Sequence, residues 1–477
     1  MQYVSTRDAR RPPERLGFEA VLLAGLARDG GLYVPESWPQ LDAAALRALR
    51  GRSYAEIAAA VMTPFLGGAI EPAQFRRLVE GAYATFGHAA VAPLKQLGDD
   101  LWLLELFHGP TLAFKDYALQ LVGPLFDHVL RRRGERVTVV GATSGDTGSA
   151  AIEALRDRES VDVFILYPEG RVSEVQRRQM TTVPSANVRA LAINGTFDDC
   201  QDLVKGMFAD VQFRAAHNLS AVNSINFARV MAQTAYYVAA ALALGAPDSA
   251  VSFAVPTGNF GNVYAAHAAR KMGLPIAELV IGTNQNDILT RFLNDGAMTI
   301  TGVEPSLSPS MDIQVSSNFE RLYHELKGGD GAAVAAAFKT FRATGTLPVS
   351  DAEWRRAREL FSAARCDDAE TLKEIAATHR ATGELLDPHS AIAVATAKRA
   401  RRDKSAPIVA LATAHPAKFP DAVERAVAIR PPLPPRMADL YDRPERIQAL
   451  PNDLSAVENF IAAHARPVAA PARAGGG

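Results

Sequence analysis

The sequence has very little cysteine. Among its 477 residues there are only Cys200 and Cys366, which lie far apart and belong to no Cys-x-x-Cys pair. Two such thiols cannot build a disulfide framework or a thiolate metal site. Their scarcity excludes a small disulfide-stapled secreted domain and favours a reducing compartment, the cytoplasm.

The chain also lacks an excess of charge of either sign. The 51 Lys and Arg residues stand against 52 Asp and Glu residues, which leaves a formal net charge of -1. No global field would therefore attract nucleic acid or an anionic membrane surface. Any anionic ligand must be held by a local site, so we expect a small-molecule substrate and no nucleic-acid partner.

Long hydrophobic runs are absent as well. The longest apolar stretch beyond the N-terminal region, residues 236–246, is well short of the ~18 to 20 residues that a membrane-spanning helix needs. The early apolar run at residues 18–26 contains Glu19, lacks a small-residue cleavage site and repeats its apolar residues at helical spacing. We therefore expect an amphipathic surface helix there and no membrane partner.

What the sequence does contain is globular in its proportions, with 48% hydrophobic and 22% charged residues. The length predicts two or three domains. We expect a helix-rich N-terminal domain over residues 1–90 and an α/β core over residues 91–430, with a helical insertion at about 285–405. Residues 431–477 are expected to form a C-terminal extension, whose Pro-, Ala- and Gly-rich tail from Arg466 is predicted to be disordered.

The pattern changes near residue 100 to short β-branched runs that alternate with helical periodicity. This alternation is typical of parallel sheets covered by helices. Strands are predicted over residues 136–140, 161–166, 188–193, 251–255, 279–282 and 408–412, and helices over residues 116–132, 198–209, 226–244 and 261–271.

Two of the strand-to-helix junctions are rich in glycine and in hydroxyl or amide side chains. They read GATSGDTG at residues 141–148 and PTGNFGN at residues 256–262. Glycine lets the backbone approach a ligand, and the following helix N-terminus supplies free N–H groups, so each loop suits a phosphate or carboxylate. An ordinary helix N-cap is the alternative for each loop. Neither matches a dinucleotide or nucleoside-triphosphate motif, which favours a phosphorylated cofactor and an acidic substrate.

A third segment, ELFHGPTLAFKD at residues 105–116, places Lys115 in an otherwise apolar loop just before a predicted helix, and no other lysine has a comparable setting. A desolvated amine is nucleophilic and can form a Schiff base with a carbonyl cofactor. A lysine whose stem lies on apolar surface and whose head reaches water is the alternative. Combined with two anion-binding loops on a parallel sheet, a reactive lysine is what pyridoxal 5'-phosphate requires.

With these segments the chain resembles the threonine synthase family, pyridoxal-phosphate enzymes of the tryptophan synthase β-like fold, and in particular its fungal and proteobacterial-type subgroup. The family's motifs stand here as YVSTR (residues 3–7), HGPTLAFKD (108–116), SGDTG (144–148), NSINFAR (223–229), GNFGN (258–262) and TAHPAK (413–418). The resemblance implies an α/β fold with two open twisted parallel-sheet lobes and a helical N-terminal domain. Asp8 departs from the glycine that usually follows the opening motif.

The activity implied by the resemblance is the conversion of O-phospho-L-homoserine and water to L-threonine and phosphate, the last step of threonine biosynthesis. Lys115 would be the catalytic residue and would bind the cofactor covalently. The other implied cofactor-binding residues are Asp146, Gly258, Asn259, Phe260, Gly261, Asn262 and Thr413, with Thr413 at the pyridine nitrogen and Asp146 near the cofactor's 3′-oxygen. The implied substrate-binding residues are Thr111, Ser144, Thr147, Asn223, Ser224 and Arg229.

Two other functions stay open at this point. A serine or threonine dehydratase-like lyase shares the fold and the lysine but needs no second phosphate site, so the segment at residues 223–229 separates the two enzymes. A catalytically silent relative that binds phosphorylated metabolites is the other alternative, and the intact Lys115 and Thr413 argue against it. A metal site is not expected, because the histidines show no H-E-x-x-H spacing. We expect a monomer or a homodimer.

Overall fold

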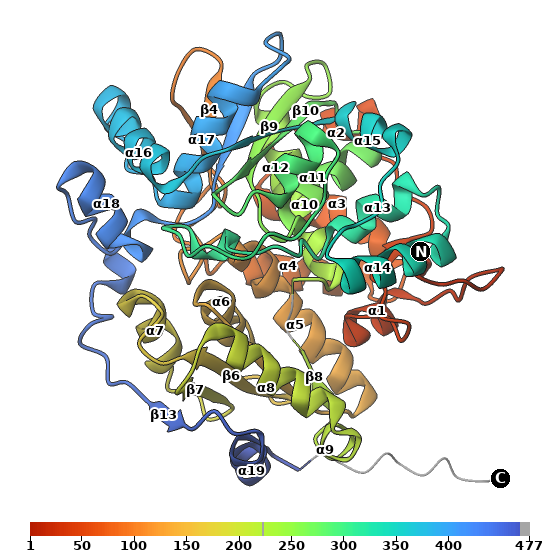
Figure 1. Cartoon of the computed structure of the whole chain (residues 1–477), viewed down its shortest axis with the longest axis vertical. Helices are drawn as coiled ribbons and strands as arrows, with labels where there is room; N and C mark the ends of the chain where they lie inside the picture. Colours follow the sequence, from red (N-terminus) through yellow and green to blue (C-terminus); the bar gives the residue numbers. More distant parts are fainter. Residues whose placement is uncertain (222–223, 468–477) are drawn as a thin grey trace. The chain divides into compact units, whose positions relative to one another are not determined.

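The computed structural model describes residues 1–221 and 224–467, and these fall into two compact units. Unit 1 combines Met1–Ala118 with Ser224–Leu433, and unit 2 combines Leu119–Asn223 with Pro434–Gly477. The division falls within helix α5 (Lys115–Arg133), so each unit is built from two stretches that are distant in the sequence (Figure 1).

Unit 1 is built around a six-stranded sheet with the strand order β11-β10-β9-β12-β4-β3. All neighbours are parallel except β3 and β4, which are antiparallel. Buried strands of parallel sheets are apolar on both faces, which is why β9 and β12 read as continuous apolar runs. The strands are β3 (Leu94–Gln96), β4 (Leu101–Glu105), β9 (Val251–Pro256), β10 (Ile276–Thr283), β11 (Phe361–Arg365) and β12 (Ile408–Ala412).

Helices cover both faces of this sheet. On one face Ala254 packs in a buried cluster with Ile375 and Val394 of helices α16 and α17. On the other face the Phe253 ring contacts Tyr237 of α10, with ring centroids 4.9 Å apart. The core helices of unit 1 are α10 (Phe227–Ala243), α11 (Gly261–Lys271), α12 (Ile288–Asp295), α16 (Asp368–Thr382), α17 (Pro388–Ala400) and α18 (Pro420–Val427).

The N-terminal region packs on α10 through helix α3 (Tyr54–Leu66) and is helix-rich, as predicted. It also contains a small antiparallel sheet of β1 (Tyr3–Ser5) and β2 (Tyr33–Pro35), which the sequence pattern did not reveal because each strand has only 3 residues. The remaining elements of unit 1 are α1 (Phe18–Ala24), α2 (Ala43–Ala48), α4 (Pro72–Tyr83), α13 (Phe319–Leu326), α14 (Gly331–Thr344), α15 (Asp351–Arg358), η1 (Pro309–Met311) and η2 (Pro416–Lys418).

Unit 2 contains an all-parallel sheet with the order β13-β7-β6-β5-β8. Its buried core joins strand residues such as Phe164 and Leu191 to Leu203 of α8 and Ile461 of α19. The strands are β5 (Val137–Ala142), β6 (Val161–Pro168), β7 (Val188–Ile193), β8 (Leu219–Ser220) and β13 (Ile447–Leu450). Besides most of α5, the helices are α6 (Asp146–Leu155), α7 (Glu174–Thr181), α8 (Phe197–Ala209), α9 (Val211–Ala216), α19 (Leu454–His464) and η3 (Pro435–Met437).

The predicted α/β fold, with parallel sheets in two lobes and a helical N-terminal region, is confirmed. Every predicted strand and helix corresponds to an element of the structure to within a few residues. The prediction of a disordered tail is wrong at Arg466, whose guanidinium and backbone N–H donate to Asp162, while residues 468–477 lie outside the described part of the chain.

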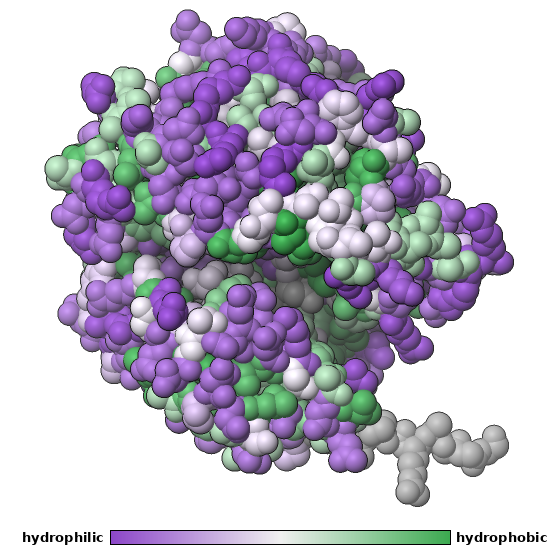
Figure 2. Space-filling view, viewed as in Figure 1, coloured by the Kyte–Doolittle hydropathy of each residue, from purple (hydrophilic) through white to green (hydrophobic). Residues whose placement is uncertain are grey.

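No helix among the described residues is long and apolar enough to cross a membrane. Figure 2 shows hydrophilic residues over most of the visible face, with hydrophobic residues in small groups between them. The surface therefore agrees with the balanced charge and the short apolar runs of the sequence.

Candidate active site

The candidate site of unit 1 lies at the carboxyl ends of β9 and β12, which are neighbouring parallel strands. The glycine loop after β9 and Thr413 after β12 are therefore placed at the same edge of the sheet. From β9 the strand order continues through β10 and β11 on one side, whereas β12 and β4 lie on the other. Ligands of open α/β sheets bind at such a switch in strand order.

Lys115 is held at this edge by the first turn of α5. The preceding backbone N–H, that of Phe114, donates to the carbonyl of Thr413 at 2.8 Å. The Lys115 side chain is only 8% exposed, and its Nζ donates to Ser310 Oγ at 3.3 Å. The amine is therefore buried, which excludes the alternative of a head group reaching into water.

A second buried lysine, Lys418, shows that sequence reasoning was wrong to treat Lys115 as the only lysine in an apolar setting. Lys418 is 0% exposed, and its Nζ donates to the carbonyl of Thr111 at 2.7 Å. The Thr111 hydroxyl and N–H both donate to the Asp116 carboxylate at 2.8 Å. Thr111 thus holds the loop before Lys115 in place, and its hydroxyl is hydrogen-bonded to Asp116.

The glycine loop after β9 presents unpaired backbone donors. Among the described residues, no acceptor is bonded to the N–H groups of Gly258, Asn259, Phe260, Gly261 or Asn262. Phe260 has a left-handed backbone conformation, with φ 63, which turns successive N–H groups inward to form an anion-binding concavity. A Cβ on Gly258 would lie 3.0 Å from the carbonyl oxygen of Ser310, so any side chain there would push the two loops apart.

The far end of this loop is fixed by two buried tyrosines of α10. The hydroxyls of Tyr236 and Tyr237 both donate to Asn262 Oδ1, at 2.5 and 2.6 Å. These bonds orient the amide so that its Nδ2 is buried without a hydrogen-bond partner in the described chain. Together with the free N–H groups, this arrangement suits a phosphate or a carboxylate at the start of α11.

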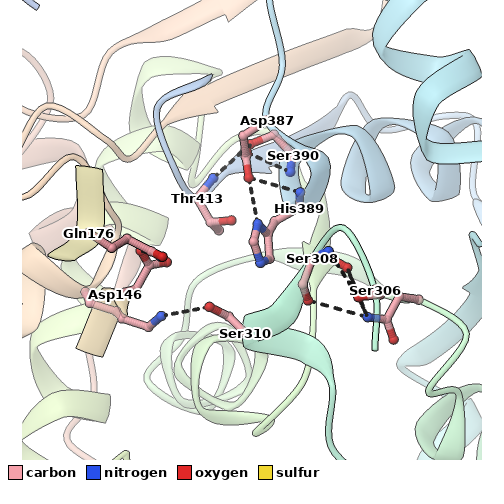
Figure 3. Close-up of polar contacts among 11 residues, drawn as sticks. Asp146, Gln176, Ser306, Ser308, Ser310, Asp387, His389, Ser390 and Thr413 are labelled. Carbon is pink, nitrogen blue, oxygen red and sulfur yellow. Dashed lines mark hydrogen bonds and ion pairs between the residues drawn. The ribbon is translucent and has the colours of Figure 1, made fainter. Parts of the chain in front are cut away.

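The hydroxyl of Thr413 is not bonded to any residue that the structure describes. Its N–H donates to Ser390 Oγ at 3.1 Å and its carbonyl accepts from Phe114, but its side-chain oxygen has no hydrogen bond to any described residue. The hydroxyl is therefore available to a ligand. Figure 3 shows Thr413 beside Asp387 and Ser390 at the edge of the sheet.

Arg229 lies in the first turn of α10 and is 4% exposed. Its Nε and Nη1 have no hydrogen-bond partner, and no carboxylate is paired with it, within the described residues. Burial lowers the pKa of Arg229 from 12.5 to about 10. A buried, unpaired guanidinium costs free energy unless an anionic ligand neutralises it.

The other residues of this segment are less informative. The carbonyl of Ser224 accepts a hydrogen bond from Asn318 Nδ2 at 3.2 Å, which connects the segment to the loop before α13. The predicted role of Asn223 falls outside the described residues.

In unit 2, the loop between β5 and α6 has the geometry of an anion site of its own. The Thr143 hydroxyl accepts from the N–H groups of Gly145 and Gly148, at 3.0 and 2.8 Å, and so folds the loop. The N–H groups of Ser144 and Thr147 are left without an acceptor in the described chain. They can therefore donate to a ligand at the N-terminus of α6.

Asp146 is buried in the same loop, and its Oδ1 accepts from Gln176 Nε2 at 2.9 Å (Figure 3). Gly145 has φ 133, and a Cβ there would lie 2.4 Å from the Gln176 side chain. Glycine thus permits the contact that orients Asp146, although the role predicted for Asp146 at the cofactor stays a prediction.

Sequence reasoning missed the loop at residues 304–314 altogether. Ser310 contacts Lys115, and Asp312 accepts from the side chains of Ser306, Asn284 and Asn286 at 2.5, 2.7 and 3.0 Å. The run SPSMD at residues 308–312 resembles an ordinary polar loop, and its only signal was the two serines around a proline. Long-range packing alone brings it to the lysine.

No group of His, Cys, Asp and Glu side chains among the described residues could hold a metal ion. Both cysteines are buried, and burial raises the pKa of Cys200 to about 12 and that of Cys366 to about 11. The chemistry of the site therefore depends on the buried amine, the anion-binding loops and the buried arginine.

Three family models match the chain. The model described as threonine synthase N terminus matches residues 2–83, the model described as pyridoxal-phosphate dependent enzyme matches residues 87–414, and the model described as threonine synthase, C-terminal, matches residues 390–461. Together the models span the elements that carry every described site residue above.

Known proteins agree with these matches. The threonine synthase of Pseudomonas aeruginosa is 54% identical over 465 residues, which cover 97% of this chain and 98% of the relative. The crystal structure of pyridoxal-phosphate-bound threonine synthase from Brucella melitensis has a TM-score of 0.95 and 55% identity, covering 98% of this chain and 100% of that one. The yeast threonine synthase structure has a TM-score of 0.91 and 40% identity, with 97% and 98% covered. The chain therefore belongs to the threonine synthase family of pyridoxal-phosphate-dependent enzymes.

Proposed function

We propose that this chain catalyses the conversion of O-phospho-L-homoserine and water to L-threonine and inorganic phosphate, in the cytoplasm, as the last step of threonine biosynthesis. The family membership supports the reaction class. The identity of the phosphorylated substrate and the role of each residue are our proposals, and they rest on the geometry of the site.

The residues of unit 1 fit pyridoxal phosphate. Lys115 offers a buried amine for the cofactor's carbonyl carbon, and the unpaired N–H groups of residues 258–262 offer donors for its phosphate. The partner-free hydroxyl of Thr413 lies on the adjoining strand end, where it can hydrogen-bond the pyridine nitrogen. When bound, the cofactor supplies an electron sink for negative charge on the substrate carbons.

The observation that carries the choice of substrate is Arg229. The backbone donors after β9 would bind the cofactor phosphate, so a separate buried guanidinium that no described residue pairs indicates a second anion. A phosphate ester provides that anion, and charge-assisted hydrogen bonds to Nε and Nη1 would then offset the cost of burial. A dehydratase substrate, which has no phosphate, would leave Arg229 unpaired.

The remaining residues can be given definite tasks. Lys115 Nζ would take and return the proton at the substrate's Cα, and Ser310 Oγ would hold the amine in position. The N–H groups of Ser144 and Thr147 would donate hydrogen bonds to the substrate carboxylate. Asp146, fixed by Gln176, would orient this loop.

The test is a pair of assays on the purified protein loaded with cofactor. Release of phosphate from O-phospho-L-homoserine should match the appearance of L-threonine one for one, measured by phosphate colorimetry and chiral chromatography. Ammonia and a keto acid formed from L-serine or L-threonine, with no phosphate release from the ester, would indicate the dehydratase instead. Cofactor binding without turnover of either substrate would indicate the silent phosphometabolite-binding relative.

A further inference from the structure

A histidine that no argument above uses lies beside Thr413. His389 follows the N-cap of α17, is 4% exposed, and places its Nδ1 2.7 Å from Asp387 Oδ2. Its Nε2 is buried and has no hydrogen-bond partner among the residues the structure describes. In Figure 3 the imidazole extends from Asp387 toward the area between Thr413, Ser308 and Ser310.

The hydrogen bonds around Asp387 determine which nitrogen of His389 is the base. Asp387 accepts from the N–H groups of His389 and Ser390 and from the Ser390 hydroxyl, so its carboxylate acts only as an acceptor. Nδ1 must therefore carry the proton that points at Asp387, which leaves Nε2 of the neutral ring with a free lone pair. The same Ser390 hydroxyl accepts from the N–H of Thr413 and so fixes the histidine to the end of β12.

Helix capping does not account for this arrangement. Capping of α17 requires only that the Asp387 carboxylate accept hydrogen bonds from backbone N–H groups, and it already does so. The imidazole of His389 is not needed for the cap. A buried, unpaired Nε2 is costly in a folded protein. His389 also lies near the loop at residues 304–314. Burial raises the pKa of Asp312 in that loop, and His389 is among the neighbouring groups that act in the opposite direction.

The stoichiometry of the proposed reaction contains two separate proton transfers. One hydrogen leaves Cβ and one leaves the attacking water. One hydrogen is added to Cγ and one to the phosphate. The phosphate oxygen departs with the electron pair of its bond to Cγ. Lys115 Nζ can carry the proton from Cβ to Cγ, and the transfer from the water to the phosphate is then open to a second group.

We infer that His389 is this second proton carrier, a proposal that rests on the proposed function. A lone pair of the water oxygen forms the bond to Cβ, and the π bond between Cα and Cβ breaks, its electron pair moving to Cα, where the electron sink supplied by the cofactor would stabilise it. One O–H bond of the water breaks, its electron pair stays on oxygen, and the proton passes to His389 Nε2. The N–H bond so formed then gives the proton to the phosphate product. Asp387 positions the ring through its bond to Nδ1.

The test compares variants of the cofactor-loaded enzyme. His389→Asn keeps an amide donor near the position of Nδ1 but removes Nε2, and it should lower kcat about 100-fold or more while KM changes by less than about threefold. Cofactor affinity should stay within about threefold of wild type, measured by fluorescence titration. His267→Asn is the matched control, because His267 is also buried and bonded to a carboxylate, Glu325, at 3.0 Å, and it should keep kcat within about twofold.

Two further measurements distinguish proton transfer from a structural role. Exchange of the Cα hydrogen of L-2-aminobutyrate with D2O, followed by NMR, should be as fast in His389→Asn as in wild type, because Lys115 handles that proton. Added imidazole should restore turnover of His389→Ala in a saturable manner. A parallel loss of Cα exchange, absence of rescue, or kcat within threefold of wild type would each overturn the inference. Wild-type enzyme that forms no threonine would instead overturn the proposed function.

Discussion

At the scale of single residues, Arg229 links stability to recognition. A base whose pKa falls from 12.5 to about 10 on folding is harder to keep charged in the folded protein. At about 1.4 kcal/mol per pKa unit, its burial below about pH 10 costs roughly 3 kcal/mol of unfolding free energy. Arg229→Leu should therefore raise the melting temperature of the cofactor-loaded, substrate-free protein. It should also lower kcat/KM for O-phospho-L-homoserine, by a factor that corresponds to a loss of roughly 2 to 5 kcal/mol of transition-state stabilisation.

Inorganic phosphate provides the control for that prediction. With the cofactor already bound, added phosphate should raise the melting temperature of the wild type and leave that of Arg229→Leu unchanged. Equal stabilisation of both proteins by phosphate would show that Arg229 does not face the anion. Loss of the visible cofactor absorption in Arg229→Leu would assign the guanidinium to the cofactor instead.

Lys115 can be distinguished from the other buried lysine by chemistry. Lys115→Ala should abolish turnover, because the cofactor's carbonyl carbon loses its nucleophile. The fold should persist, because only one side chain in the first turn of α5 becomes smaller. Borohydride reduction of the wild type, followed by digestion and mass spectrometry, should leave the cofactor mass on the peptide containing Lys115. Cofactor found on the Lys418 peptide would contradict the assignment.

The role of Thr413 can be tested through cofactor affinity, separately from those of Arg229 and Lys115. Thr413→Ala should weaken cofactor binding by about 1 to 3 kcal/mol, because the pyridine nitrogen would be left unpaired in a buried site. Thr413→Ser keeps the hydroxyl and should bind the cofactor within a few-fold of wild type, as equilibrium dialysis would show. Thr413→Asp should bind the cofactor but turn over slowly, since a carboxylate favours protonation of that nitrogen. Unchanged affinity in Thr413→Ala would show that the hydroxyl does not contact the cofactor.

At the scale of elements, the loop after β9 depends on the close approach of two backbones. A Cβ at Gly258 would lie 3.0 Å from the Ser310 carbonyl oxygen and 3.1 Å from Met311 Cα, and neither backbone atom can rotate away. Gly258→Ala should displace the loop at a cost of about 1 to 3 kcal/mol and weaken cofactor binding accordingly. Gly17→Ala, where a Cβ meets nothing within 4 Å, should leave both stability and binding unchanged in thermal melts and cofactor titrations. Normal cofactor affinity in Gly258→Ala would refute this account.

The same elements show how far the sequence could predict the structure. Buried parallel strands such as β7 (Val188–Ile193) and β12 are continuous apolar runs, and both were predicted to the residue. β4 was missed, because LWLLE contains no β-branched residue, and His389 was missed because Asp-Pro-His-Ser reads as a helix N-cap. Local patterns reveal loops and caps, whereas the contact of Ser310 with Lys115 joins residues that are distant in sequence and depends on tertiary packing.

At the scale of the whole molecule, the chain crosses between its two units more than once, which no local pattern indicates. The predicted boundaries at residues 90 and 430 stay predictions, whereas the compact units combine separated stretches. The C-terminal stretch contributes β13 and α19 to unit 2, where Val457 and Ile461 pack against α8. Residues near the C-terminus therefore stabilise the unit that carries the loop of Ser144 and Asp146.

Because each unit has its own buried core, we expect two separable transitions when the substrate-free protein is heated in a scanning calorimeter. Ile375 in unit 1 and Ile461 in unit 2 form a matched pair, each 0% exposed in a cluster confined to its unit. Replacing either by alanine should cost about 2 to 5 kcal/mol, since each change opens a cavity. Ile461→Ala should lower the transition of unit 2 and leave that of unit 1 in place, and Ile375→Ala should do the reverse. A single transition whose temperature both substitutions lower equally would show instead that the two cores unfold together. A change near the C-terminus would then destabilise the lysine site as much as the substrate loop.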